Sequence, residues 1–306
     1  EQAKISGWDT VREGYRTDGS ILALPYGAGS YFYVFYRPSM FQQAGVEFVE
    51  PKTWEDMLSL GEALKAKGVT PFWVCNQEGY MGAWAIAALG GGQLGANAFT
   101  EMVLKNQPIN SPGLIEAYKA YADMFARGLT NPDAGQLQNG EATSGFIQGR
   151  AAMTINGAWS NAELLEALGD DVGMFPIPTL ASAKEPGVLA GGPNLAVFVT
   201  NYAANKDAAF KFIKYLAEAK TMDLYVELSQ TEPSNHKDAD PSVITNRLLR
   251  EQAERLKSVK TVYPFDNIMP QPVIDLFYRV NATVFTGQQT AEDAVAQLQA
   301  EFDKQA

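Results

Sequence analysis

Strand-like and helix-like segments alternate along the whole chain, and this alternation limits the possible fold more than any other feature. The segment 30–36, SYFYVFY, is dense in β-branched and aromatic residues, which predicts a strand. The segment 51–68 has the punctuation of a helix. Thr53 and Asp56 have the spacing of an N-terminal capping box, and Gly68 suits the helix end. Alternating helices and strands predict a layered α/β fold.

The same alternation continues to the end of the chain. Further strands are expected at 21–27, 70–76, 151–156 and 194–200, and further helices at 83–89, 111–128, 143–150, 205–219 and 290–306. Trp54 and Phe212 lie on the apolar stripes of two predicted helices, which predicts that both side chains belong to the core.

Length and charge exclude several classes of protein. The 306 residues are enough for two domains of ordinary size. The net charge is −11, with 24 Lys and Arg against 35 Asp and Glu, and this argues against a nucleic-acid partner because phosphate binding needs a basic face. No segment has the run of about 18 apolar residues that a membrane-spanning helix needs.

The sequence offers little material for a metal or cofactor site. Cys75 is the only cysteine, which excludes an internal disulfide and a multi-cysteine metal site. His236 is the only histidine and lies in a polar segment, so we expect a loop residue with satisfied hydrogen bonds rather than a catalytic base. The segment 90–95, GGGQLG, matches a dinucleotide-binding pattern, but a helix-like segment precedes it and no acidic residue follows at about 20 residues. We therefore predict a glycine-rich helix end there, and no cofactor or metal.

Carboxylates and aromatic rings are the residues left for function. Glu78, Glu141 and Asp266 lie in loop-like segments, and two of them could serve as the acid and base of a glycosidase. Several aromatic residues lie in turns rather than in helix stripes: Tyr26, Tyr31, Tyr80 and Trp159. An aromatic face beside a few polar groups suits a sugar. Trp159 follows the small residues of AAMTING, and this pattern alone fits both a core position and a ligand contact.

Longer motifs occur in an order that is typical of one family. The chain contains, in sequence, DGSILALPY, VFYRPSMFQQAGV, PKTWEDMLSLGEALKAKG, FIQGRAAMTINGAWS, VGMFPIP, GGPNLAVF and FTGQQTAEDAVAQLQAEFD. This order resembles the extracellular solute-binding proteins of bacterial ABC importers, in particular the family typified by maltose-binding protein. The G-x-AAM-x-x-x-G-x-W and P-x-TW motifs together are fairly specific, and the resemblance covers essentially the whole chain.

The resemblance implies a periplasmic-binding-protein-like α/β fold of type II, with a ligand cleft between two lobes. The N-terminal lobe is expected to consist of 1–35 and 195–262, and the C-terminal lobe of 36–194 and 263–306. Family members carry a long segment before the residues that match the start of this chain, so the N-terminal lobe is expected to be incomplete here.

The resemblance also implies which residues contact a ligand. Trp159 matches the family tryptophan that stacks on a sugar ring, and the segment 76–80, NQEGY, resembles a sugar-binding loop of the family. The full set of expected ligand-binding residues is Ser30, Tyr31, Asn76, Glu78, Tyr80, Trp159, Gly192, Asn194, Asp266 and Phe277.

These expectations combine into one function with two alternatives. The chain is expected to be the substrate-binding component of an ABC importer, a monomer in the periplasm or at the cell surface. It is expected to bind a sugar or oligosaccharide by hinge closure and to deliver it to the permease subunits without catalysing a reaction. The alternatives are a glycosidase that uses two carboxylates, and a binding protein of the same fold with a non-sugar solute.

Overall fold

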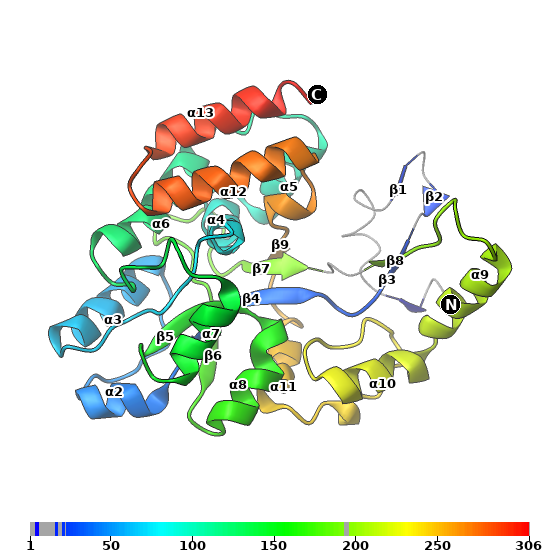
Figure 1. Cartoon of the computed structure of the whole chain (residues 1–306), viewed down its shortest axis with the longest axis horizontal. Coiled ribbons are helices and arrows are strands. Elements are labelled where there is room, and N and C mark those ends of the chain that lie inside the picture. Colours follow the sequence, from blue (N-terminus) through cyan, green and yellow to red (C-terminus); the bar gives the residue numbers. More distant parts are fainter. Residues whose placement is uncertain (1–3, 6–15, 18–19, 22, 193–195, 306) are drawn as a thin grey trace. The chain divides into compact units, whose positions relative to one another are not determined.

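A computed structural model describes residues 4–5, 16–17, 20–21, 23–192 and 196–305 (Figure 1). The chain forms two compact units. Unit 1 takes the described residues of 1–31, 157–165 and 191–258, and unit 2 takes those of 32–156, 166–190 and 259–306. The lobes expected from the sequence change over at 35, 194 and 262, each four residues after a change between the units, at 31, 190 and 258. The placement of residues 157–165 in unit 1 was not expected from the sequence. The assignment of the two lobes stays a prediction.

Unit 2 holds most of the helices. Its helices are α2 (Pro38–Ala44), α3 (Trp54–Ala66), α4 (Tyr80–Leu94), α5 (Ala96–Leu104), α6 (Pro112–Ala126), α7 (Asn139–Ile147), α12 (Gln271–Phe285) and α13 (Ala291–Phe302), with the short 3₁₀ helix η4 (Phe265–Asn267). The helices α4, α6, α12 and α13 pack on one another, and Figure 1 shows α12 and α13 side by side. The expected capping box of α3 is confirmed, since Thr53 and Asp56 exchange hydrogen bonds.

Helix α4 lies at the centre of this helix group. Nearly every one of its residues is buried, as expected for a helix that is apolar all round. Its glycines are required by close packing: a Cβ on Gly90 would lie 2.7 Å from Phe99 Cε2, and a Cβ on Gly91 would lie 2.9 Å from Val262 Cγ1. The helix ends at Leu94. The segment 90–95 is therefore a tightly packed helix end, as predicted, and not a dinucleotide loop.

A mixed sheet runs beside the helices. Strands β5 (Met153–Gly157), β4 (Ser30–Tyr36), β7 (Leu189–Gly192) and β9 (Thr261–Val262) follow one another in this order, and β6 (Gly173–Pro176) also pairs with β4. The pairs β4–β6 and β4–β7 are antiparallel, whereas β7–β9 is parallel. The predicted strand 30–36 is confirmed residue for residue.

Unit 1 is built from shorter elements. They are β1 (Arg16–Thr17), β2 (Ser20–Ile21), β3 (Leu24–Pro25), β8 (Ala196–Val197), α9 (Lys206–Leu216), α10 (Ala219–Ser229) and α11 (Arg247–Arg255), with the 3₁₀ helices η2 (Ala158–Ser160) and η3 (Pro241–Val243). Helix α8 (Asn161–Leu168) begins in unit 1 and ends in unit 2. Unit 1 contains a small apolar cluster, whose buried members are Ile5, Leu24, Ala217 and Met222.

The two aromatic residues assigned to the core have different outcomes. Trp54 is fully buried, and its indole N–H donates to the carbonyl of Ala120 at 3.1 Å. Phe212 is 58% exposed, so its assignment to the core was wrong. Within the described part of unit 1, Ile213 and Leu216 are the side chains of α9 that pack against the small cluster, whereas Phe210, Phe212 and Tyr215 are exposed.

Several predicted strands are shorter in the structure. The segment 70–76 is largely buried, but it pairs as a strand only at Phe72, which bridges Thr130 and Met153. The described part of 194–200 contains only the two-residue β8. Among the described helices, none is long and apolar enough to cross a membrane.

Candidate functional site

The loop 76–80 is held in unit 2 by helix α12. The side chain of Asn281 donates to the carbonyl of Gly79 at 3.1 Å, and the side chain of Asn76 donates to the carbonyl of Asn281 at 3.2 Å. Gly79 has a φ of +75°, and a Cβ there would lie 2.1 Å from the carbonyl oxygen of Tyr278. The loop therefore needs glycine at 79 both for its backbone conformation and for its approach to α12.

Two predicted ligand residues of this loop reach the surface. Glu78 is exposed, and one of its carboxylate oxygens accepts from the backbone N–H of Asn139 at 3.4 Å, where α7 begins. Tyr80 is half-buried, with its ring centroid 4.9 Å from that of Trp84. Burial raises the pKa of Tyr80 above its ordinary value, so its hydroxyl stays protonated and can donate a hydrogen bond.

Asp266 and Tyr278 form a hydrogen-bonded pair next to the loop. The Tyr278 hydroxyl donates to Asp266 Oδ2 at 2.9 Å, while Asp266 Oδ1 is buried without a hydrogen-bond partner among the described residues. Burial raises the pKa of Asp266 to about 6, although the bond from Tyr278 lowers it. Tyr80 contributes to raising the pKa of Tyr278, so the loop and the pair are electrostatic neighbours. The second carboxylate oxygen of Asp266 is thus a buried acceptor that no described residue uses.

Phe277 does not belong to this site. Its side chain is fully buried, with its ring near those of Tyr118, Phe265 and Tyr278. The sequence expectation is corrected: Phe277 is a core residue, because it lies on the buried stripe of α12 with Val273, Ile274 and Val280. The half-buried Tyr278, one residue further, is the aromatic side chain that this segment brings to the cluster.

Trp159 lies in unit 1, directly after the point where the chain leaves unit 2. All residues of β5 are buried, as are Ala158 and Ser160, whereas Trp159 is partly exposed. The indole ring lies on Gly157, where a Cβ would be 2.1 Å from Trp159 Cζ3. Gly157 has an ordinary φ of −89°, so glycine is needed for the ring and not for the turn.

Ser30, Tyr31 and Gly192 also lie in unit 1. Ser30 and Tyr31 are buried and pair with Gly192 and Gly191 between β4 and β7. The Tyr31 hydroxyl donates to the carbonyl of Ala28 at 3.2 Å. Asn194 lies outside the described residues.

The structure therefore brings together part of the predicted set. In unit 2, Asn76, Glu78, Tyr80 and Asp266 form one cluster. Sequence reasoning missed three residues that belong with them, namely Tyr278, Asn139 and Asn281. The period of α12 could have identified Tyr278, since it falls just outside the buried stripe that contains Phe277. The ligand-binding role of the whole set stays a prediction.

The described residues suggest neither a metal site nor a reactive thiol. They contain no group of three or more His, Cys, Asp or Glu side chains that could hold a metal ion. Cys75 is buried, and burial raises the pKa of its thiol to about 12, with a smaller effect from Glu78. His236 is a buried loop residue whose Nδ1 accepts from the backbone N–H of Asp238 at 3.1 Å.

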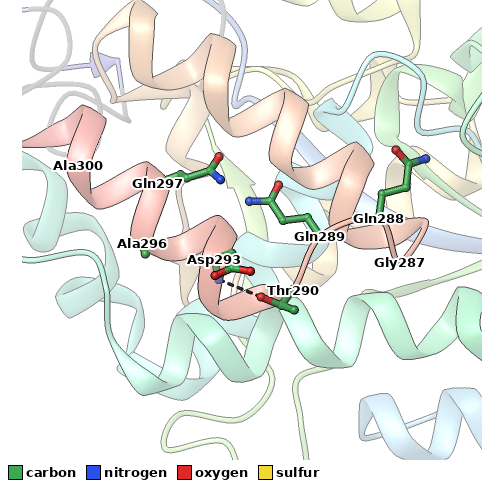
Figure 2. A pocket seen from close by; sticks show the side chains of 8 residues that line it. All are labelled: Gly287, Gln288, Gln289, Thr290, Asp293, Ala296, Gln297 and Ala300. Atoms are coloured by element: carbon green, nitrogen blue, oxygen red, sulfur yellow. Dashed lines mark hydrogen bonds between the residues drawn. The ribbon is translucent and has the colours of Figure 1, made fainter.

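Two pockets lie away from the predicted residues. A surface pocket of about 540 Å³ lies at the start of α13. Figure 2 shows residues that line it, among them Gln288, Gln289 and Gln297. The dashed line marks the helix cap, in which Thr290 Oγ1 accepts from the Asp293 N–H at 3.1 Å. A second, more apolar pocket of about 290 Å³ lies in unit 1 beside α11. None of the predicted ligand residues lines either pocket.

Comparisons with known proteins agree on one family. Residues 2–250 match the profile of a family described as bacterial extracellular solute-binding protein. The chain is 27% identical over 205 residues to a multiple sugar-binding protein of Streptococcus mutans, which covers 64% of this chain and 47% of that protein. It is 26% identical over 240 residues to a maltodextrin-binding protein of Bacillus subtilis, which covers 74% of this chain and 53% of that protein. The chain thus spans about half the length of these curated relatives.

The fold has close counterparts among solved structures. A chitin oligosaccharide binding protein superposes with a TM-score of 0.85 at 22% sequence identity, over 99% of this chain and 75% of that one. The expected fold of a type II periplasmic binding protein is confirmed by this similarity.

Proposed function

Because the chain belongs to the bacterial extracellular solute-binding proteins, we propose that it binds a sugar or oligosaccharide and passes it to an ABC importer. The observation that carries the choice of ligand is the cluster in unit 2. Tyr80 and Tyr278 supply aromatic faces, while Asp266 and Glu78 supply hydrogen-bond acceptors. Rings beside a few polar groups match the apolar face and the hydroxyls of a sugar.

We infer that Trp159 adds a further stacking surface from unit 1. Its ring is large, partly exposed and held against Gly157, so little freedom is lost when a ligand packs on it. A ligand favours one of two states of a protein only through a difference in its contacts with those states. Hinge closure is the motion that we propose on this basis.

Binding without catalysis is the second part of the proposal. Of the three carboxylates considered for a glycosidase, Glu141 is engaged in the cap of α7, where its carboxylate accepts from the backbone N–H of Gln138 at 2.9 Å. Asp266 accepts a hydrogen bond from the Tyr278 hydroxyl at 2.9 Å. We propose that these groups orient the ligand and make or break no bond.

The partner and the location follow from this role. We propose that the protein acts outside the cytoplasm, in the periplasm or at the cell surface, as a monomer that docks on the permease subunits. The family is described as extracellular, which supports this placement.

The test is a panel of mono- and oligosaccharides, with the melting temperature and calorimetric affinity as readouts. We expect one class of sugar to raise the melting temperature, and Tyr80→Ala or Trp159→Ala to weaken its binding about tenfold or more. Tyr202→Ala is the control, since this tyrosine is 95% exposed on unit 1 and should leave affinity unchanged. Absence of any shift across the panel would refute the sugar-binding proposal, and release of product from chromogenic glycosides would favour the glycosidase.

A further inference from the structure

A buried polar network fixes the chain just after Trp159. Asn161, two residues further, is fully buried, and its side-chain N–H donates to Gln252 Oε1 at 3.3 Å. The side chain of Asn246 donates to the backbone carbonyl of Asn161 at 3.0 Å. Figure 1 shows α11, which carries Gln252, near the start of α8, where Asn161 lies. All of these residues belong to unit 1.

The side chain of Asn246 both caps α11 and contacts Asn161. Its Oδ1 accepts from the backbone N–H groups of Leu248 and Leu249, at 2.8 and 3.2 Å, which caps α11. Its Nδ2 is then directed at Asn161. The N-cap residue of α11 is thereby hydrogen-bonded to Asn161, the first residue of α8. The 3₁₀ helix η2, which carries Trp159, ends immediately before Asn161.

The amide pair is a poor source of stability. Asn161 Oδ1 and Gln252 Nε2 are both buried without a hydrogen-bond partner among the described residues. A buried polar atom without a partner costs free energy, and replacing both members of such a pair by apolar groups of similar shape can leave stability almost unchanged. Directional bonds, in contrast, fix a position in a way that apolar contacts do not. The network is therefore better suited to holding the chain in place than to stabilising the fold.

We propose that Asn161, Asn246 and Gln252 are positioning residues for Trp159, which rests on the sugar-binding role proposed above. The Trp159 ring packs against Gly157, which precedes it in the chain. The backbone of Asn161, which follows it, is held by the hydrogen bond from Asn246. The indole thus stays in one orientation before a ligand arrives, and a preorganised contact binds more tightly than one that must be ordered on binding.

The main test is the double variant Asn161→Leu/Gln252→Leu, made with Trp159 present and in a Trp159→Ala background. We expect a melting temperature close to that of the parent and an affinity for the best sugar of the panel about fivefold to tenfold lower when Trp159 is present. In the Trp159→Ala background the same double variant should cost no further affinity. An equal loss in both backgrounds, or no loss with Trp159 present, would overturn the proposal.

A second readout separates this proposal from the proposed function. The near-ultraviolet circular dichroism of Trp159 is obtained, without ligand, as the difference between the parent and Trp159→Phe. We expect the Asn161→Leu/Gln252→Leu variant to lose this band, while Met222→Ala, a core variant elsewhere in unit 1, retains it. If no sugar binds at all, the sugar-binding proposal fails, and retention of the band would separately overturn the positioning role.

Asn246→Ser serves where the double variant fails to fold. Serine is a good helix N-cap, so it keeps the cap of α11 while removing the donor to Asn161. We expect the same loss of the Trp159 band and of sugar affinity. An unchanged band in this variant would also contradict the proposal.

Discussion

Glu232 should make the protein less stable as the pH rises towards and above neutrality. The carboxyl is only 3% exposed and lies against the loop 27–29, where it accepts from the Gly29 N–H at 2.9 Å and from the Tyr225 hydroxyl at 3.2 Å. Burial raises its pKa from 4.5 to about 7, and the two hydrogen bonds offset this only in part. Tyr26 and Tyr31 are its other titratable neighbours, and both are neutral at these pH values.

The size and sign of the effect follow from the two pKa values. Between about pH 4.5 and about pH 7 the folded state binds the proton of Glu232 more tightly than the unfolded state does, so the free energy of unfolding falls as the pH rises. The shift of 7 − 4.5, about 2.5 pKa units, corresponds to a loss of at most about 3 kcal/mol above pH 7. The loss is absent below the unfolded pKa.

Glu232→Gln removes the titration while keeping the shape of the protonated acid. We expect urea unfolding to show that the free energy of unfolding of the variant, relative to that of the parent, rises by up to about 3 kcal/mol between about pH 5 and about pH 8.5. Glu227→Gln, an exposed position on helix α10, which also carries Tyr225, is the control, and its difference from the parent should not change with pH. A difference between Glu232→Gln and the parent that does not change with pH would refute the reasoning.

Three further changes test the structure. Gly157→Ala should move the Trp159 ring, because the new Cβ would lie 2.1 Å from it, and should weaken sugar binding about tenfold; near-ultraviolet circular dichroism and calorimetry measure the two effects. Cys75 should react with a thiol reagent only after denaturation, because it is buried and its thiol pKa is raised to about 12; fast labelling of the native protein would contradict this burial. Thr53→Ala should lower the free energy of unfolding by about 1 kcal/mol through loss of the α3 cap, and Thr53→Ser should restore most of it in urea unfolding.

The helices were predictable because their signals are local. Thr53 caps α3 as the sequence indicated, and Thr290 caps α13 in the same way. In each case the partner is three residues away. The strands depend on partners that are distant in sequence. Phe72 forms bridges with Thr130 and Met153, and nothing in the segment 70–76 alone shows that pairing stops after one residue.

The candidate site shows the same division between local and distant information. Gly79 and Tyr80 both lie in the segment 76–80, so the sequence brings them together directly. The hydrogen bond between Asp266 and Tyr278 instead depends on how η4 packs against α12. Phe277 was assigned to the site from an alignment of a segment, and its burial follows from the packing of α12. The prediction that Phe212 is a core residue was wrong for the opposite reason. An apolar stripe on a helix leads to burial only where another element covers that face.

The three-part composition of each unit has a consequence for how the protein is made. Unit 1 needs residues up to 258 and unit 2 needs residues up to 306, so neither unit is complete until most of the chain has left the ribosome. No continuous fragment contains all of one unit without part of the other. A split of the gene at 165/166 or at 190/191 would therefore separate Trp159 from Gln252, and a single split at any boundary between the units leaves at least one unit divided between the two halves.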